Sequence, residues 1–141
     1  LRKCLPYLFM FLIVPTKQQI KSSNCCSWAG VCCDETMGQV IELDLSCSQL
    51  QGNFHPNCSL FQLSFLKRLD LSRNDFSQSH ISPKFGEFSS LTHLDLSESN
   101  MSSLIHSEIS HISKLQVLRI SKNNAHDQDG LHLGPRNFKL L

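Results

Sequence analysis

Four stretches of this chain repeat one pattern of apolar and polar residues at nearly constant spacing. Each reads apolar-x-x-Leu-x-apolar-Ser, and the stretches begin at Val40, Leu66, Leu91 and Leu115. Successive central leucines lie 26, 25 and 24 residues apart, and they are Leu43, Leu69, Leu94 and Leu118. One such unit cannot bury its leucines alone, so units must stack, and at least about three are needed. The repeat therefore restricts the chain to an elongated stack of similar units.

Within each repeat, the alternation of apolar and polar residues predicts a short strand. Leu43 and Leu45 point to one face while Asp44 points to the other, because side chains alternate along a strand. Five positions after each central leucine stands Ser48, Asn74, Ser99 or Asn123. An inward asparagine can satisfy backbone groups in the following turn, where an unpaired buried group costs about 1–3 kcal/mol. A serine does this only in part, so we expect looser turns at Ser48 and Ser99.

The second half of each unit carries apolar residues three positions apart. The triplets are Leu60, Leu63, Leu66, then Phe85, Phe88, Leu91, then Ile109, Ile112, Leu115. This spacing predicts a 3₁₀ or irregular return along the convex side. Repeats of about 20–29 residues with the core L-x-x-L-x-L-x-x-N-x-L are leucine-rich repeats. The predicted fold is a leucine-rich-repeat solenoid of the α/β type, with a short parallel sheet on its concave face.

The repeats divide the chain into four segments. We expect a signal-peptide-like or linker segment at 1–24, a cysteine cap at 25–39, about four repeats over 40–125 and an irregular, uncapped end at 126–141. Arg2 and Lys3 precede the apolar run Leu5–Val14, which has the shape of a secretory signal, although no clean cleavage site follows. The alternative is a stray apolar segment. This run is shorter than the roughly 20 residues that cross a bilayer.

Cysteines are dense in the cap. Four of the seven in the chain fall within nine residues, and they are Cys25, Cys26, Cys32 and Cys33. This density favours disulfides in an oxidising compartment, and the odd total leaves at least one thiol unpaired or paired between chains. The alternative, a zinc site, needs a second ligand cluster, whereas only isolated Cys47 and Cys58 follow.

The cap and repeats resemble a plant family. Residues 26–34, Cys-Ser-Trp-Ala-Gly-Val-Cys-Cys-Asp, resemble the N-terminal cap signature of plant leucine-rich-repeat proteins. Segments such as Ser-Leu-Phe-Gln-Leu at 59–63 and Ile-Ser-Pro-Lys-Phe-Gly-Glu-Phe at 81–88 are similar to the tomato Cf receptor-like proteins, receptors for fungal leaf-mould effectors. The resemblance implies an extracellular recognition domain in pathogen defence, partnered by receptor kinases. It also implies a Cys26–Cys33 disulfide and a cap role for Trp28.

The chain departs from this family at its start. Only about ten residues separate Val14 from Cys25, where the family has a longer cap segment with its own cysteine. Cys25 therefore lacks its usual partner unless Cys4 or Cys32 replaces it. These departures indicate a truncated or degenerate member, an N-terminal fragment of a longer array.

Outward strand positions are the candidate binding residues. They are Glu42, Asp44, Arg68, Asp70, His93, Asp95, Val117 and Arg119. The serine that ends each strand motif, Ser46, Ser72, Ser97 or Ser121, is also expected to point outward. Parallel neighbours stack about 4.8 Å apart, so Asp44, Asp70 and Asp95 should form an acidic column that ends at Arg119. Like charges at this spacing repel, which favours a cationic partner or local pairing with the arginines. The alternative is a solvated face without a specific use.

Other chemistry finds no support in the sequence. The net charge of +1 offers no basic footprint for nucleic acid or an anionic membrane. We find no nucleophile motif, phosphate loop or metalloprotease motif, and the seven histidines fit no metal spacing, so we expect no enzyme activity, metal or cofactor. Asn57 and Asn100 begin Asn-x-Ser triplets and are candidate glycosylation sites.

Three functions remain open. The first is a recognition domain of a plant receptor-like protein that binds a protein or peptide of the pathogen-effector class. The second is a secreted inhibitor of a pathogen cell-wall-degrading enzyme, similar to polygalacturonase-inhibiting proteins. The third is a decayed gene product, because few repeats leave few stabilising interfaces. The Cf-like segments favour the first.

Overall fold

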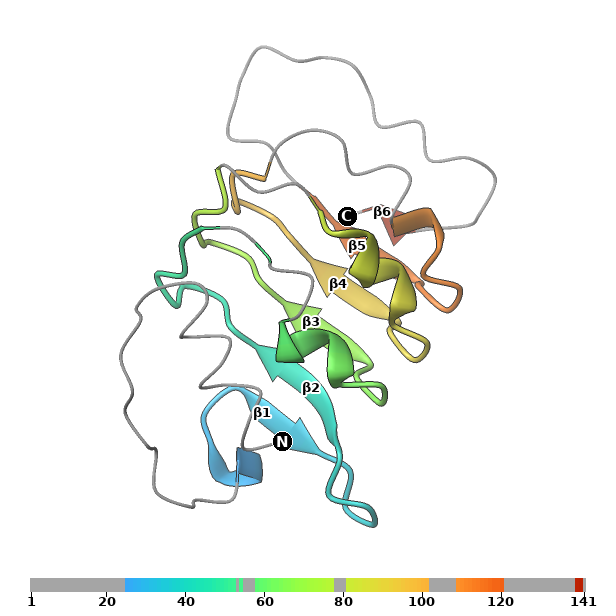
Figure 1. The fold of residues 1–141 in the computed structure, drawn as a ribbon. Coiled ribbons are helices and arrows are strands. Elements are labelled where there is room, and N and C mark those ends of the chain that lie inside the picture. The colour runs from blue at the N-terminus through green and yellow to red at the C-terminus, as the bar shows by residue number, and fades with distance from the viewer. Residues whose placement is uncertain are drawn as a thin grey trace.

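The computed structural model describes residues 25–52, 54, 58–77, 81–101, 109–120 and 139–140. These residues form a stack of repeats that share one six-stranded sheet in the order β1-β2-β3-β4-β5-β6. The strands lie side by side in Figure 1, and the helical turns cover one side of the sheet. The predicted solenoid is confirmed. Within the described residues no helix is long and apolar enough to cross a membrane.

The parallel strands come from the repeated pattern. They are β2 (Val40–Asp44), β3 (Arg68–Asp70), β4 (His93–Asp95) and β5 (Val117–Arg119). Their register places Leu43 beside Leu69, Leu69 beside Leu94 and Leu94 beside Leu118. All four leucines are at most 3% exposed. The core is therefore a continuous ladder of equivalent side chains from successive repeats.

The convex side is built from short helical turns. Two are the 3₁₀ turns η2 (Ser59–Gln62) and η3 (Pro83–Glu87), as the spacing of three predicts, whereas Ile109 and Ser110 of the next repeat are α-helical. In each repeat the second residue of the apolar triplet donates its N–H to the carbonyl of the first, at 3.1 Å for Leu63 to Leu60, 3.3 Å for Phe88 to Phe85 and 3.0 Å for Ile112 to Ile109. Residues three apart eclipse one another in a 3₁₀ turn, so the whole triplet faces the core.

Asn74 connects two repeats through its buried amide. Its Nδ2 donates to the carbonyl oxygens of Leu45, Leu71 and Ser72 at 2.9, 2.9 and 3.1 Å, and its Oδ1 accepts the N–H of Leu50 at 3.0 Å. At the equivalent positions, the hydroxyl of buried Ser99 donates to the Leu96 carbonyl at 2.6 Å, and that of Ser48 to the Ser46 carbonyl at 3.3 Å. Within the described residues each serine thus satisfies fewer backbone groups than Asn74 does, and the expectation that the serine turns are looser stays a prediction.

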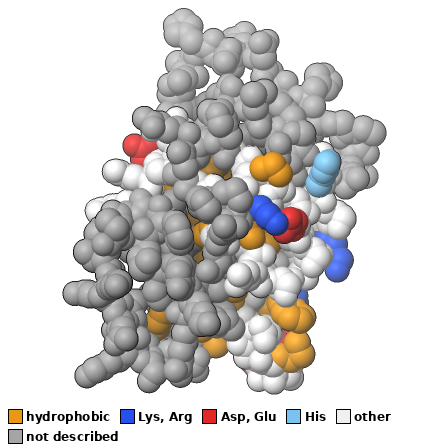
Figure 2. Space-filling model, viewed as in Figure 1, with side chains coloured by type: hydrophobic (Ala, Val, Ile, Leu, Met, Phe, Trp, Pro, Cys, Tyr) orange, Lys and Arg blue, Asp and Glu red, His pale blue; other side chains and the backbone are white. Residues whose placement is uncertain are grey.

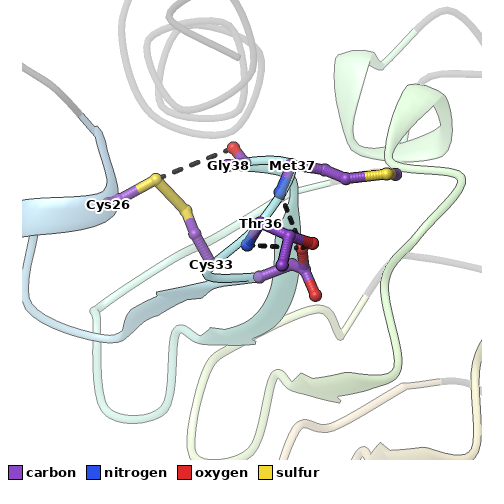
Figure 3. Close-up of a disulfide and its surroundings, with 6 residues drawn as sticks. Cys26, Cys33, Thr36, Met37 and Gly38 are labelled. Atoms are coloured by element: carbon purple, nitrogen blue, oxygen red, sulfur yellow. Dashed lines mark hydrogen bonds between the residues drawn. A yellow bond between two sulfur atoms is a disulfide. The ribbon is translucent and has the colours of Figure 1, made fainter.

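The N-terminal cap closes one end of the core. It comprises η1 (Cys25–Ser27) and β1 (Val31–Cys33), and β1 pairs antiparallel with β2. The predicted Cys26–Cys33 disulfide joins η1 to β1 (Figure 3). Trp28 is partly buried and packs against the core, as expected of a cap residue.

The hairpin between β1 and β2 is held by Asp34. Its Oδ1 accepts the Thr36 hydroxyl at 2.6 Å and the backbone N–H groups of Met37 and Thr36 at 2.8 and 3.0 Å. Thr36 and Met37 lie beside the disulfide in Figure 3. These hydrogen bonds, that of the Thr36 hydroxyl first, lower the pKa of the Asp34 carboxyl from its ordinary value. They favour the charged form and so keep the turn intact in mildly acidic solution.

The chain end contains a strand that the sequence did not predict. Residues Lys139–Leu140 form β6, which pairs parallel with β5 and places Leu140 beside Leu118. This strand lies in the segment 126–141, for which no regular structure was expected, so that expectation is wrong at these two residues. Leu140 follows Leu118 by 22 residues, within the range of one leucine-rich repeat. The divergent sequence between them concealed this spacing.

Asn74→Ala tests the connection between repeats. The substitution leaves the Leu50 N–H and three carbonyl groups without the amide, so we expect the free energy of unfolding to fall by about 2–4 kcal/mol. Urea denaturation followed by circular dichroism measures this loss. The control is Gln62→Ala, at an exposed position, which should change stability by less than about 0.5 kcal/mol. A loss for Asn74→Ala no larger than the control's would contradict the bridging role.

Gly30→Ala tests the cap against a matched glycine. Gly30 has φ +79°, and a Cβ built there would lie 2.3 Å from the Asp44 carbonyl oxygen, whereas Gly38, at φ +63°, has no atom within 4 Å of its Cβ position. We expect Gly38→Ala to cost about 1 kcal/mol from backbone conformation alone. Gly30→Ala should cost at least about 2 kcal/mol more, since backbone must also move. Equal melting temperatures for the two variants would show that the close approach is unimportant.

Candidate functional site

The strands place eight outward side chains on one surface, here called the concave face. They line a single hollow of about 180 Å³ together with the backbone of the core leucines, and they are Glu42, Asp44, Arg68, Asp70, His93, Asp95, Val117 and Arg119. These are the eight residues that the sequence singled out. The face is turned away from the viewer in Figure 1, behind the helical turns.

The convex side differs from the concave face in how its charged side chains are distributed. Figure 2 looks onto it and shows its described charged side chains scattered singly or in small groups. Lys84 and Glu87 form an exposed ion pair there, with 2.7 Å between Nζ and Oε1. Among the described residues, it is the concave face that gathers the larger set of charges around a hollow.

One column of the concave face is acidic until its last member. The register places Asp44 beside Asp70, Asp70 beside Asp95, and Asp95 beside Arg119. The Nη1 atom of Arg119 lies 3.6 Å from Oδ2 of Asp95. The expected local pairing is therefore present at the β5 end. Within the described residues no ion pair involves Asp44 or Asp70.

Each aspartate of this column also has a structural task. Its Oδ1 accepts the backbone N–H of the serine two residues later, at 2.9 Å for Asp44 to Ser46, 2.9 Å for Asp70 to Ser72 and 3.0 Å for Asp95 to Ser97. This turn explains why Leu-Asp-Leu-Ser recurs, a role that the sequence reasoning missed although the Asp-x-Ser spacing signals it. The hydrogen bond uses one oxygen of each carboxylate and leaves its negative charge in place.

The turn also corrects one sequence expectation. Ser72 was counted among the outward positions, yet it is only 8% exposed. Its repeat turn stacks closely on its neighbours, because Cys47 donates its N–H to the Ser72 carbonyl and Arg73 donates to Ser97. The correction applies to Ser72 alone, because the equivalent Ser46 and Ser97 are partly exposed.

The second column varies from repeat to repeat. Glu42 lies beside Arg68, Arg68 beside His93, and His93 beside Val117. The Nδ1 atom of His93 lies 2.8 Å from the Thr92 hydroxyl, which orients the ring. Along this column the side chain thus changes from acidic to basic, then to imidazole and then to aliphatic, while the core residue beside it is always leucine.

A second row of polar side chains borders the face. Cys47, Arg73 and Glu98 occupy the same position in the turns after β2, β3 and β4, and all three have positive φ, at 53°, 54° and 52°. Arg73 Nε lies 3.5 Å from Glu98 Oε2. A hydrogen bond with Cys47, and then the Glu98 charge, raise the pKa of Arg73. No sequence pattern marks this row, because its residue types differ.

The remaining cysteines carry no disulfide in the described part of the chain. Cys25 and Cys58 are buried, and Cys32 and Cys47 are exposed. Cys32 therefore does not replace the missing partner of Cys25, and Cys4 lies outside the described residues. Burial raises the pKa of the Cys58 thiol and keeps it protonated. Among the described residues no group of three or more potential ligands could hold a metal ion.

The two glycosylation candidates stay predictions. Asn57 lies outside the described residues. Asn100 is exposed in the turn after β4, and its Nδ2 lies 3.4 Å from Oδ1 of Asp75. A glycan at Asn100 would project from the side of the solenoid that carries these turns, beside the concave face.

Two substitutions at Asp70 separate its turn role from its charge. Asp70→Ala removes the acceptor for the nearly buried Ser72 N–H, and we expect it to lower the free energy of unfolding by about 1 kcal/mol. Asp70→Asn keeps an Oδ1 acceptor and should change stability by less than about 0.5 kcal/mol. Thermal melts of both variants measure this difference in stability. Equal losses would show that the charge, and not the turn, supports the fold.

Comparisons with known proteins agree with this geometry. The Leucine Rich Repeat family model matches residues 65–88 and 90–112. The chain is 70% identical over 121 residues to the "Receptor-like protein Cf-9 homolog" of Solanum lycopersicum, a match that covers 86% of this chain and 14% of that protein. The chain thus spans about one-seventh of the length of this relative.

Solved structures show the same fold. The BIR2 ectodomain from Arabidopsis thaliana superposes with a TM-score of 0.67 at 24% identity, over 84% of this chain and 68% of that one. The ectodomain of the Arabidopsis receptor kinase GASSHO1/SCHENGEN3, solved in complex with CASPARIAN STRIP INTEGRITY FACTOR 2, superposes with a TM-score of 0.66 at 25% identity, over 84% of this chain and 15% of that one. With its cysteine cap, its repeats and its identity to the Cf-9 homolog, the chain belongs to the leucine-rich-repeat receptor-like proteins of plants.

Proposed function

We propose that the concave face binds a protein or peptide ligand of the pathogen-effector class, as part of a non-catalytic extracellular receptor-like protein in plant defence. The proposal is supported mainly by the contrast between core leucines that recur and outward side chains that vary from repeat to repeat. Core leucines recur in every repeat, while the second outward column changes from Glu42 through Arg68 and His93 to Val117. Solenoids commonly use such concave surfaces for binding.

The relatives support the same role. The Cf-9 homolog is a receptor-like protein, and the GASSHO1/SCHENGEN3 ectodomain was solved in complex with CASPARIAN STRIP INTEGRITY FACTOR 2. We extend to this chain a location outside the cell or at its surface, and a receptor kinase partner that would carry a signal.

An inhibitor of a pathogen cell-wall-degrading enzyme is the alternative. It would use the same face, so the fold alone favours neither function. The 70% identity to a receptor-like protein favours the receptor. Inhibition of a fungal polygalacturonase by the purified chain would favour the alternative.

Retention of a ligand from infected leaves tests the proposal. The full chain, secreted from plant cells and immobilised, is exposed to apoplastic fluid from infected and uninfected leaves, and retained proteins are identified by mass spectrometry. We expect a pathogen protein or peptide to be retained only from infected leaves. The double substitution Arg68→Ala and Arg119→Ala should weaken its retention at least about five-fold, since arginines often dominate interfaces.

The control for this experiment lies on the convex side. Lys84→Ala removes an exposed cation of η3 without touching the face and should leave retention unchanged. Equal retention by wild type and the double variant, or no pathogen component on either, would contradict binding through the concave face. A retained cell-wall-degrading enzyme that loses activity on binding would instead favour the inhibitor.

A further inference from the structure

We propose that the concave face selects an extended peptide segment by the order of its charges. The segment would cross β2 to β5 with a basic side chain over β2 and an acidic side chain about four residues away, over β5. This inference rests on the proposed function, because it concerns the same face, and it names the chemistry of the ligand.

The two ends of the sheet carry opposite charges. β2 presents Glu42 and Asp44 and no base, whereas β5 presents Arg119 and Val117 and no acid. Between them, β3 presents one charge of each sign, and β4 presents one acid, which pairs with Arg119. A ligand lying along the solenoid axis therefore meets a negative potential at one end and a guanidinium at the other. Such complementarity sets specificity more than total affinity.

Local pairing does not cancel this order. Among the described residues no ion pair involves Glu42 or Asp44, and the N–H that Asp44 accepts from Ser46 belongs to neutral backbone. At the other end the Nη1 atom of Arg119 lies 3.6 Å from Asp95 Oδ2, and the Arg119 side chain is 52% exposed. A guanidinium has five N–H donors, so Arg119 can bind a further carboxylate.

The distance between the two ends fixes the spacing of the ligand charges. Strands in a sheet lie about 4.8 Å apart, so β2 and β5 are separated by roughly 14 Å. An extended peptide advances about 3.3 Å per residue and covers that distance in about four residues. A basic and an acidic residue four positions apart therefore reach both ends, whereas adjacent ones reach only one.

A titration with two synthetic peptides tests this spacing. Both consist of glycine and serine with one arginine and one glutamate, placed four positions apart in the first and adjacent in the second. Each is added to the full chain labelled with ¹⁵N, and amide chemical shifts give the affinity and the binding surface. We expect shifts over β2 to β5 and about three-fold tighter binding of the first peptide, the effect of one surface ion pair.

Substitutions that keep the fold provide the controls. Glu42→Gln together with Asp44→Asn removes both charges from the acidic end but retains the Oδ1 acceptor of the Asp44 turn, and it should abolish the preference for the first peptide. Asp75→Asn is the matched control, since Asp75 accepts the Ser77 N–H at 3.2 Å in the same way but does not line the hollow. It should leave the preference unchanged, and melts of all variants verify the fold.

Other outcomes separate the two proposals. Equal affinity for both peptides, with shifts on the concave face, would overturn the charge order and leave the binding face intact. An absence of shifts on the strands with either peptide, or a loss of preference in Asp75→Asn, would also overturn it. The retention of a pathogen component from apoplastic fluid would still decide the proposed function independently.

Discussion

The structure depends on the fact that no repeat can bury its own leucines. Leu43, Leu69 and Leu94 are each at most 3% exposed, and each reaches this burial only because another repeat lies on either side or, for Leu43, because the cap does. Stability in such a stack is a sum of repeat and interface terms. This constraint explains why the cap contains a glycine that approaches Asp44 and a disulfide, since the first repeat would otherwise expose its core.

The same constraint decides which polar residues must recur. A turn buried between repeats leaves backbone groups without water, so Asn74 satisfies four of them and connects two repeats. The aspartate column solves a similar problem for the serine N–H groups at the strand ends. Because this task requires an acceptor, it favours aspartate or asparagine in this column and so restricts the charge there to negative or neutral. The chemistry of the aspartate column is thus set partly by the requirements of folding. The column beside it, from Glu42 to Val117, is free to vary.

Features that recur with the repeat period could be predicted from the sequence. Strand register, the 3₁₀ triplets and the membership of the concave face follow from one period, so Leu43 to Leu118 and all eight outward residues could be placed without coordinates. Features without a period could not be placed. The row Cys47, Arg73 and Glu98 shares a backbone conformation and not a residue type. Strand β6 was hidden because a divergent segment precedes Leu140, and Ser72 was misjudged because its burial depends on how tightly turns stack.

The two roles of the aspartates bear on how such a face can change. Replacing Asp44 or Asp70 by asparagine preserves the turn and alters the charge, whereas replacement by an apolar residue would leave a serine N–H without its acceptor. In the repeat that contains β5, Arg119 stands in place of the aspartate and pairs with Asp95 of the preceding repeat. Charge along this column can therefore vary only through residues that solve the same hydrogen-bonding problem or through pairing with a neighbour. The second column carries no such restriction, which makes Arg68 and His93 the positions where ligand specificity can change at least cost to stability.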